Sequence, residues 1–331
     1  MYEKRLKNIT PVINDLITEQ VLLNESLQNE YPVDSIVFDP AAIGRPIFQK
    51  PWVRAALIKA LLGYKRNFGG DLGALLRKLY IDMDLQNDSF NKIDSSRWYR
   101  KIQGIVELTQ MEIRISDVTI LPLTNSKIPE LRVAARNAYL QISKNNPFKF
   151  FDIATEPLLP WDRLEMFKII TTTKDIAIPN FSRWISYSTN KSIVSFCLEL
   201  IAHYSQHNAI PAVMHLIDTN DHFLRARAIN CLGKLRAEEA EDKFIEIYTN
   251  QPINCQLEII KALGRINSGR YIEFLKHEFL YSFDFYIRKN AARAIIRNVD
   301  IGSDTYNDLM RSSSTENQLI LKHCSNPLIK Y

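Results

Sequence analysis

The sequence predicts an all-α fold, an α-α superhelix or right-handed solenoid of about seven to eight helical hairpins, and three observations support this prediction. One pattern of apolar residues recurs at nearly constant spacing along most of the chain. Short amphipathic stretches lie between the recurring segments, as expected where helices are paired. Glycine contributes only 10 of 331 residues, which is low for a sheet-rich fold. Since one hairpin alone leaves its apolar stripe exposed, we expect successive hairpins to stack.

The recurring pattern places small or apolar residues at a first position, numbered zero, and at positions +4, +7 and +8. In an α-helix these positions fall within about 100° of arc and form one buried stripe. Successive zero positions are 45, 33, 31, 31, 31, 31 and 32 residues apart, a regularity that predicts one B helix per repeat. The zero positions are Val53, Trp98, Leu131, Asp162, Ile193, Leu224, Cys255 and Ile287.

Shorter amphipathic stretches between the B helices predict a partner A helix for each. Three of them are Ile210–Ile217, Lys243–Tyr248 and Tyr271–Leu280. Pro211 stands where the first turn of a helix tolerates proline, and the polar cluster at residues 218–221 separates an A helix from its B helix.

Both ends of the chain depart from the repeat. Residues 1–50 predict an N-terminal capping helix, around Val12–Leu27, followed by a Pro-rich linker. Residues 51–299 hold the repeats, and residues 300–331 predict a degenerate C-terminal capping hairpin. We therefore expect one continuous domain.

The B-helix register, apolar-Arg-x-x-Ala-x-x-Ala-Leu-Gly-x-Ile, resembles HEAT repeats, specifically the short HEAT-like type of many bacterial proteins and phycobilin lyases. The resemblance spans roughly residues 51–298, and it implies an armadillo-like helical scaffold. The segments LRKLY (76–80) and RWYRKIQGIVELTQM (97–111) are also similar to uncharacterised bacterial HEAT-repeat proteins, some of which carry an N-terminal membrane anchor. We expect the arginines at position +1 to bond a neighbouring helix or loop carbonyl; they are Arg54, Arg132, Arg163, Arg225 and Arg288.

Composition limits the compartment and the chemistry. The cysteines show no CxxC spacing, which favours a reducing compartment, and Cys197, Cys231 and Cys255 fall in the buried stripe. The chain has no run of about 18 apolar residues, so we expect no membrane span. These features predict a cytoplasmic protein, or one on the cytoplasmic side of a membrane if an N-terminal anchor lies outside this chain.

No catalytic or metal-binding motif stands out. The sequence lacks the GxSxG, P-loop and dinucleotide-binding fingerprints, so we expect a non-catalytic protein without cofactor or metal. His203 and His207 have the i,i+4 spacing of a zinc clamp, but no further ligand accompanies them. Most aromatic residues, including Trp52, Trp98 and Trp161, are expected in the core.

One charged pattern remains. Positions +6 and +10 lie beside the buried stripe, and in the last repeats they are rich in lysine and arginine. In HEAT-like solenoids the B helices line the concave side, so these residues would face a groove as a basic ladder. Its members are Lys234, Lys261, Arg265, Arg293 and Arg297 at positions +6 and +10, together with Arg227 at position +3.

These patterns support three hypotheses about function. The leading one is a monomeric protein-interaction scaffold that binds a protein partner through its concave face. The first alternative is nucleic-acid or other polyanion binding through the ladder, which a net charge of +5 permits without requiring. The second is a cell-envelope-associated adaptor, as the anchored relatives imply. Against all three, the ladder is also explained as a solvated face balanced by Glu258 and nearby acids.

Overall fold

The structure is a computed structural model that describes residues 2–24, 32–39, 43, 46–143, 146–173 and 176–329. These residues form helices and contain no β-strand, which confirms the predicted all-α class. None of the described helices combines the length and the apolar character that a bilayer span requires.

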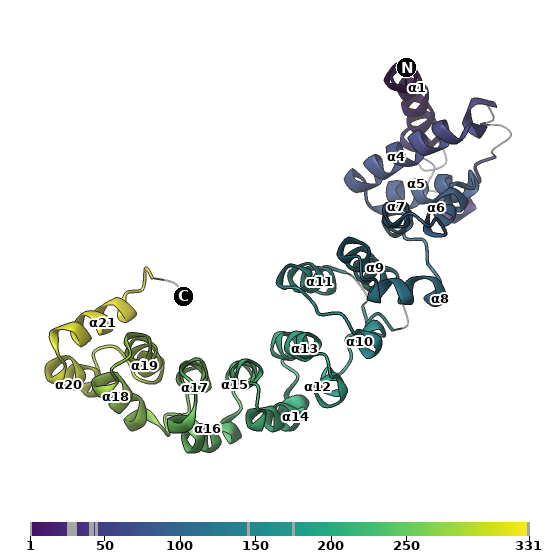
Figure 1. Ribbon diagram of the computed structural model, residues 1–331. Coiled ribbons are helices and arrows are strands. Elements are labelled where there is room, and N and C mark those ends of the chain that lie inside the picture. Colours follow the sequence, from purple (N-terminus) through teal and green to yellow (C-terminus); the bar gives the residue numbers. More distant parts are fainter. Residues whose placement is uncertain are drawn as a thin grey trace. The chain divides into compact units, whose positions relative to one another are not determined.

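Helices alternate with short loops over the described residues (Figure 1). The α-helices are α1 (Tyr2–Ile17), α4 (Pro51–Asn67), α5 (Gly70–Asp82), α6 (Leu85–Ile93), α7 (Trp98–Gln110), α8 (Asp117–Ile120), α9 (Pro129–Ile142), α10 (Phe150–Ile153), α11 (Pro160–Thr172), α12 (Ser182–Tyr187), α13 (Lys191–His203), α14 (Ile210–His215), α15 (His222–Leu235), α16 (Glu241–Ile247), α17 (Ile253–Ile266), α18 (Ile272–Tyr281), α19 (Phe285–Asn298), α20 (Asp304–Ser312) and α21 (Thr315–Ser325). The π-helical turn η1 covers Thr18–Leu22, and the 3₁₀ segments are η2 (Val33–Ser35), η3 (Pro46–Gln49), η4 (Leu121–Asn125), η5 (His207–Ala209), η6 (Leu216–Asp218), η7 (Glu238–Ala240) and η8 (Tyr248–Asn250).

The chain divides into two compact units. Unit 1 comprises Met1–Glu156 and Pro160–Ala177, and unit 2 comprises Pro157–Leu159 and Ile178–Tyr331. The boundaries expected near residues 50 and 300 fall inside the units, and a single continuous domain remains a prediction.

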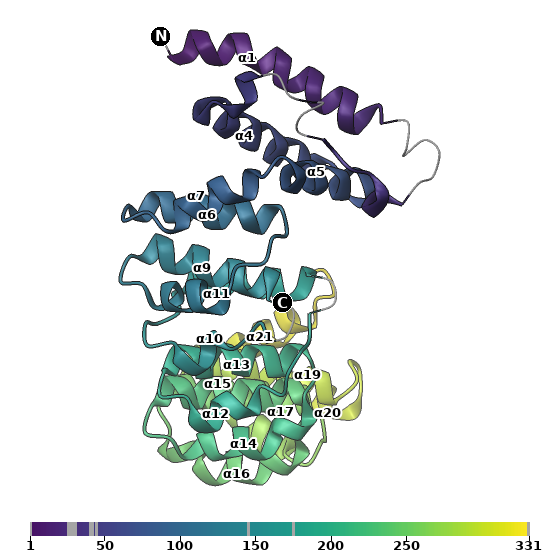
Figure 2. The ribbon, with the colours of Figure 1, turned by 90° about the vertical axis from the view of Figure 1, so that its right-hand side faces the viewer.

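Unit 1 contains the N-terminal helices. Helix α4 packs between α1 and α5, and α6 packs against α7 (Figure 2). Both α5 and α6 lie between α4 and α7 in the chain, which accounts for the first spacing of 45 residues. Helix α1 begins at Tyr2 and ends before the π-helical turn, earlier than the stretch expected around Val12–Leu27, and residues 25–27 lie outside the described residues.

Unit 2 arranges its helices in two rows. Helices α13, α15, α17 and α19 form an inner row, and α12, α14, α16 and α18 form an outer row (Figure 1). Each inner helix packs against the next inner helix, and α19 packs against α21. The inner helices are the predicted B helices, and α14, α16 and α18 coincide with the three predicted A helices within a few residues.

Two glycines set the spacing of the inner row. Gly233 of α15 faces Ala262 of α17, and Gly264 of α17 faces Ala294 of α19. A Cβ atom on either glycine would stand 2.6–2.7 Å from the Cα atom of the facing alanine. Glycine at position +9 and alanine at position +7 therefore let the helix backbones approach more closely than larger residues permit.

The arginine at position +1 anchors the loop before its own helix in three repeats, as predicted. Its guanidinium donates a hydrogen bond to the carbonyl oxygen of the residue six positions earlier, so a partly buried loop oxygen gains a charged donor. The three bonds join Arg132 to Ser126 at 2.6 Å, Arg225 to Thr219 at 3.1 Å and Arg288 to Ser282 at 3.0 Å. Arg54 differs, because it bonds the carbonyl oxygens of Met83 and Asp84.

The register predicted for α7 is wrong at two positions. Trp98 and Val106 were expected in the buried stripe, but they are 43% and 38% exposed, whereas Ile105 of the same stripe is buried. The buried face of α7 also holds Gly104, which packs on the Ser89 carbonyl, and Glu107. Glu107 accepts hydrogen bonds from Ser89 Oγ and Lys92 Nζ, so a polar network decides which side of the helix is inside.

Two further expectations fail at helix ends. Trp161 lies in the first turn of α11 and is 69% exposed, whereas the next residue, Asp162, is buried, so the buried face of this turn does not include Trp161. His203 and His207 do not share a helix face, since α13 ends at His203 and Ser205 adopts a φ of 50° before η5 begins.

The cysteines of the stripe are buried as predicted. Burial raises the pKa of the Cys197 thiol well above its usual range and that of Cys231 to about 12, and it also raises the pKa of Cys255. Because the thiolate is the reactive form, we expect Cys197, Cys231 and Cys255 to resist a maleimide reagent at pH 8 in the native protein. Peptide mapping of the labelled chain measures this, with urea-unfolded protein as the control. Rapid native labelling of all three would contradict the register of α13, α15 and α17.

Candidate functional site

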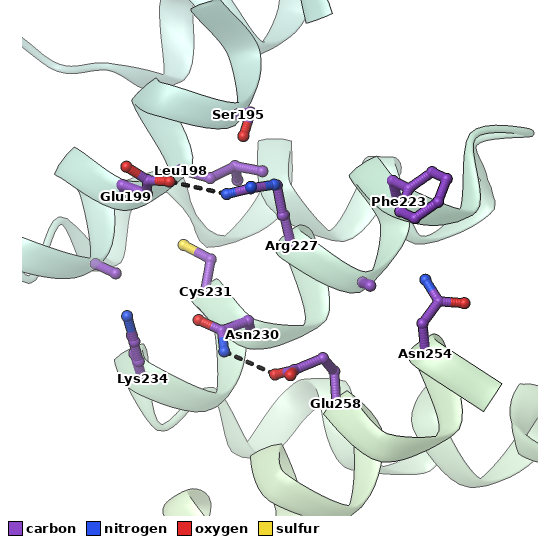
Figure 3. A pocket seen from close by; sticks show the side chains of 12 residues that line it. Ser195, Leu198, Glu199, Phe223, Arg227, Asn230, Cys231, Lys234, Asn254 and Glu258 are labelled. Carbon is purple, nitrogen blue, oxygen red and sulfur yellow. Dashed lines mark hydrogen bonds and ion pairs between the residues drawn. The ribbon is translucent and has the colours of Figure 1, made fainter. Parts of the chain in front are cut away.

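A groove of about 680 Å³ runs over three helices of the inner row, α13, α15 and α17. Phe223 and Asn254 lie at one end of this groove and Lys234 lies at the other (Figure 3). Its wall combines apolar, amide and charged side chains. The lining residues are Ser195, Leu198, Glu199, Ala202, Phe223, Ala226, Arg227, Asn230, Cys231, Lys234, Asn254 and Glu258.

Polar pairs bridge successive helices across this groove. Glu199 of α13 accepts an ion-pair hydrogen bond from Arg227 of α15 at 2.8 Å. Asn230 of α15 donates to Glu258 of α17 at 2.7 Å (Figure 3). Each pair joins position +6 of one B helix to position +3 of the next. Each pair also contains one carboxylate. The donors Arg227 and Asn230 therefore each have an acceptor on the neighbouring helix.

The same pairing occurs in unit 1. There Asn137 of α9, at position +6, donates to Glu165 of α11, at position +3, at 3.0 Å. The residues at positions +6 and +3 therefore join successive B helices at three steps, α9 to α11, α13 to α15 and α15 to α17.

The step from α17 to α19 has no carboxylate at these two positions. Its two positions are Lys261 and Asn290, which line a concavity of about 190 Å³ together with Arg265, Arg293, Ala294 and Arg297. None of the described residues that line it is acidic. Lys261 turns back within its own helix to Glu258, with its Nζ atom 2.8 Å from Oε1.

A second concavity of about 440 Å³ adjoins the first and shares Arg265 and Arg297 with it. It adds Lys234 and Arg236, and the described residues that line it again include no acid. Arg236 follows the last residue of α15 with a φ of 54°, in the left-handed region that a non-glycine residue adopts only at a cost.

The Arg265 side chain is 27% exposed, less than the 33% of Lys261 on the same helix. Burial lowers the pKa of its guanidinium; Glu258 opposes this shift, and Arg297 and Arg293 add to it. Its Nη1 atom is buried without a hydrogen-bond partner, and the nearest acidic oxygen, Oε2 of Glu258, is 3.8 Å away. The cluster therefore holds cations close enough together to disfavour one another's charge.

The cluster contains Lys234, Arg236, Lys261, Arg265, Arg293 and Arg297, and Glu258 is a carboxylate that Lys261 and Arg265 both approach. Basic residues near a helix C-terminus also complement its dipole, which amounts to about half a charge per helix.

The structure brings most of the predicted basic ladder together. Five of its six members, all except Arg227, line the two concavities, whereas Arg227 lies in the larger groove and pairs with Glu199. Sequence reasoning did not single out Arg236, which lies beyond the helical pattern, or Asn290. The signal for Asn290 was available, because it occupies position +3 of the last full repeat.

Within the described residues, no group of three or more His, Cys, Asp or Glu side chains is placed to hold a metal ion. Comparison with protein-family models found no matching family, and comparison with curated proteins found no match.

Proposed function

We propose that this chain is a non-catalytic, HEAT-like α-solenoid scaffold whose inner row binds an acidic segment of a protein partner. The observation that carries the proposal is the cation cluster on α15, α17 and α19, whose two concavities are lined by no acidic side chain among the described residues. Charges on the wall of a hollow surface focus potential and speed the encounter with an oppositely charged partner.

The neighbouring groove supports a protein segment as the occupant. An extended peptide needs apolar contacts as well as ionic ones, and the groove offers Leu198 and the 68% exposed Phe223 beside the amides of Asn230 and Asn254. The repeated contacts within the inner row support the solenoid part of the proposal, since each helix buries its stripe against the next.

Charge reversal tests this proposal. We expect the double variant Lys261→Glu, Arg293→Glu to bind a fluorescein-labelled octaglutamate peptide at least about tenfold more weakly than the unaltered chain. Both side chains line the same concavity, so the reversal replaces attraction by repulsion at one place. Fluorescence anisotropy at low salt measures the affinity, and the melting temperature should stay nearly unchanged because neither side chain is buried.

The matched control is the double variant Lys243→Glu, Lys276→Glu, which makes the same charge change on the outer helices α16 and α18. We expect this control to keep the affinity within about twofold, because surface charges farther than a Debye length of about 10 Å are screened. Equal loss in both variants would mean that net charge, and not the cluster, binds the peptide.

Nucleic-acid binding is the second candidate, and the same cluster of cations favours it. A single-stranded oligonucleotide would lose affinity steeply with salt, with a logarithmic slope of about 0.7 per phosphate contacted. A peptide that also uses the apolar groove would lose less. Titrations of both probes at two salt concentrations separate the candidates.

A further inference from the structure

We propose that the groove over α13, α15 and α17 binds an extended partner segment in which an apolar residue and an acidic residue are six positions apart. This inference rests on the proposed function and specifies the sequence that the partner segment carries. Its basis is that the two ends of the groove differ in chemistry and that helix α15 fixes the distance between them (Figure 3).

One end of the groove suits an apolar side chain. Phe223 lines this end as the second residue of α15, and its side chain is 68% exposed. The neighbouring Asn254 amide bonds His222 twice, with Oδ1 3.2 Å from the ring atom Nδ1 and with Nδ2 donating to the carbonyl oxygen at 3.1 Å. What this end offers a partner is therefore an aromatic ring, and aromatic rings of this kind often anchor a bound segment.

The other end of the groove is basic. Lys234 lines both the groove and the concavity of about 440 Å³, so the two hollows meet there. Arg236, Arg265 and Arg297 line the same concavity, and the acidic residues of η7 lie outside its lining. Lys234, Arg236 and Arg297 form no ion pair with a described residue, and Nη1 of Arg265 is buried without a hydrogen-bond partner. A carboxylate that enters this concavity would meet several charged donors.

Helix α15 sets the distance between the two ends. Phe223 and Arg236 are 13 residues apart, and a rise of about 1.5 Å per residue separates them by about 20 Å along the helix axis. An extended chain advances about 3.3 Å per residue and covers this distance in about six residues. Side chains alternate along an extended chain, so residues six apart point to the same side and residues five apart point to opposite sides. At a spacing of six, both side chains can enter the groove together.

The size of the groove favours an extended segment over a helix. The groove is about 16 Å long between Phe223 and Lys234, so its volume of about 680 Å³ corresponds to a mean cross-section of about 40 Å². An α-helix with its side chains is about 10 Å across, which gives about twice this cross-section. A helical segment would also need about 13 residues to span the two ends.

Fluorescein-labelled peptides of one composition test the spacing. Each holds one leucine and two glutamates among serines, with the glutamates six and eight, five and seven, or 13 and 15 positions from the leucine. Each is made with the leucine first and with the leucine last, and the tighter order is compared. We expect the intact chain to bind the six-and-eight peptide about tenfold more tightly than the five-and-seven peptide by fluorescence anisotropy, the gain of one charge-assisted hydrogen bond.

Substitution of the leucine tests the apolar end. We expect the six-and-eight peptide to lose about fivefold in affinity when serine replaces its leucine. In the variant Phe223→Ala this loss should shrink to about twofold or less. The matched control is Phe283→Ala, which removes another exposed phenylalanine, in the loop before α19, and should keep the full loss.

Two further variants test the basic end. The advantage of the six-and-eight peptide over the five-and-seven peptide should disappear in Lys234→Gln, Arg236→Gln, because both side chains line the concavity that the glutamates enter. It should persist in the control Lys243→Gln, Lys276→Gln on the outer helices. All four side chains are at least partly exposed, so both variants should keep the fold.

The outcomes separate this inference from the proposed function. Equal affinity for all spacings, tightest binding at 13 and 15, or a spacing preference that survives in Lys234→Gln, Arg236→Gln would overturn the inference. If octaglutamate still binds and loses affinity in Lys261→Glu, Arg293→Glu, the proposed function stands despite that result. If no acidic peptide binds, both proposals fail. If a single-stranded oligonucleotide binds more tightly than every peptide, with the steep salt dependence of a polyanion, the occupant is nucleic acid and the peptide assignment is wrong.

Discussion

Replacing Gly264 with valine is expected to lower the free energy of unfolding by about 3 kcal/mol, the upper part of the range for overpacked interiors. The added Cβ atom would stand 2.7 Å from both the Cα and Cβ atoms of Ala294, and a backbone atom cannot rotate aside. Valine gains some helix propensity over glycine, but this gain is smaller than 1 kcal/mol. Urea unfolding followed by circular dichroism measures the effect.

Gly63→Ala is the control for this substitution. Gly63 lies within α4, and a Cβ atom there would meet nothing within 4 Å. Because alanine exceeds glycine in helix propensity by about 0.8–1.0 kcal/mol, this variant should be more stable than the unaltered chain. If Gly264→Val unfolds at the same urea concentration as the unaltered chain, the close approach of α17 and α19 is not a feature of the protein.

Replacing Arg288 with methionine is expected to cost about 2–3 kcal/mol of unfolding free energy. The guanidinium donates to the carbonyl oxygens of Ser282 and Phe283 at 3.0 and 3.2 Å and pairs with Glu316 at 2.8 Å. Methionine keeps most of the apolar stem but leaves the loop carbonyls without their charged donor. Thermal and urea unfolding should both report the loss.

Arg311→Met provides the comparison, because the Arg311 side chain is 82% exposed and its nearest carboxylate, on Asp308, is 4.0 Å away. We expect this variant to change stability by less than about 0.5 kcal/mol. A cost at Arg288 as small as that at Arg311 would show that the loop anchor contributes nothing measurable.

The sequence predicted the helices of the repeats because their apolar positions follow the 3.6-residue period closely. It failed in α7 for a physical reason. Apolar spacing places Trp98 and Val106 in the stripe, but Glu107 is buried by its bonds to Ser89 and Lys92, and a pattern based on hydrophobicity assigns a glutamate to the surface.

The spacing of the repeats also did not reveal the division into two units. The spacing of 31 residues continues through Leu131, Asp162 and Ile193, on both sides of the boundary near residues 156–178. Periodicity reports that each helix has a buried face. It carries no information on how many contacts join one hairpin to the next.

For the candidate site, helical spacing predicted which cations share a face but not which of them are neutralised. Arg227 and Lys261 belong to the same predicted ladder, yet Arg227 pairs with Glu199 across helices and Lys261 pairs within its own helix. That difference depends on the residue at position +3 or +6 of the neighbouring repeat. Only the packing of α13, α15, α17 and α19 reveals this relation.

At each step between neighbouring inner helices, the residues at positions +6 and +3 contribute to the charge of the exposed surface. This charge can therefore be altered by changing only two residues. Substitution of Asn290 by glutamate would give the step between α17 and α19 a carboxylate like Glu258 of the preceding step, without altering the buried stripe. In a repeat array each hairpin interacts chiefly with its neighbours. Substitutions at these positions can therefore change the ligand preference of one step of the inner row at a time, in evolution or by design. The helices and their buried contacts would stay the same.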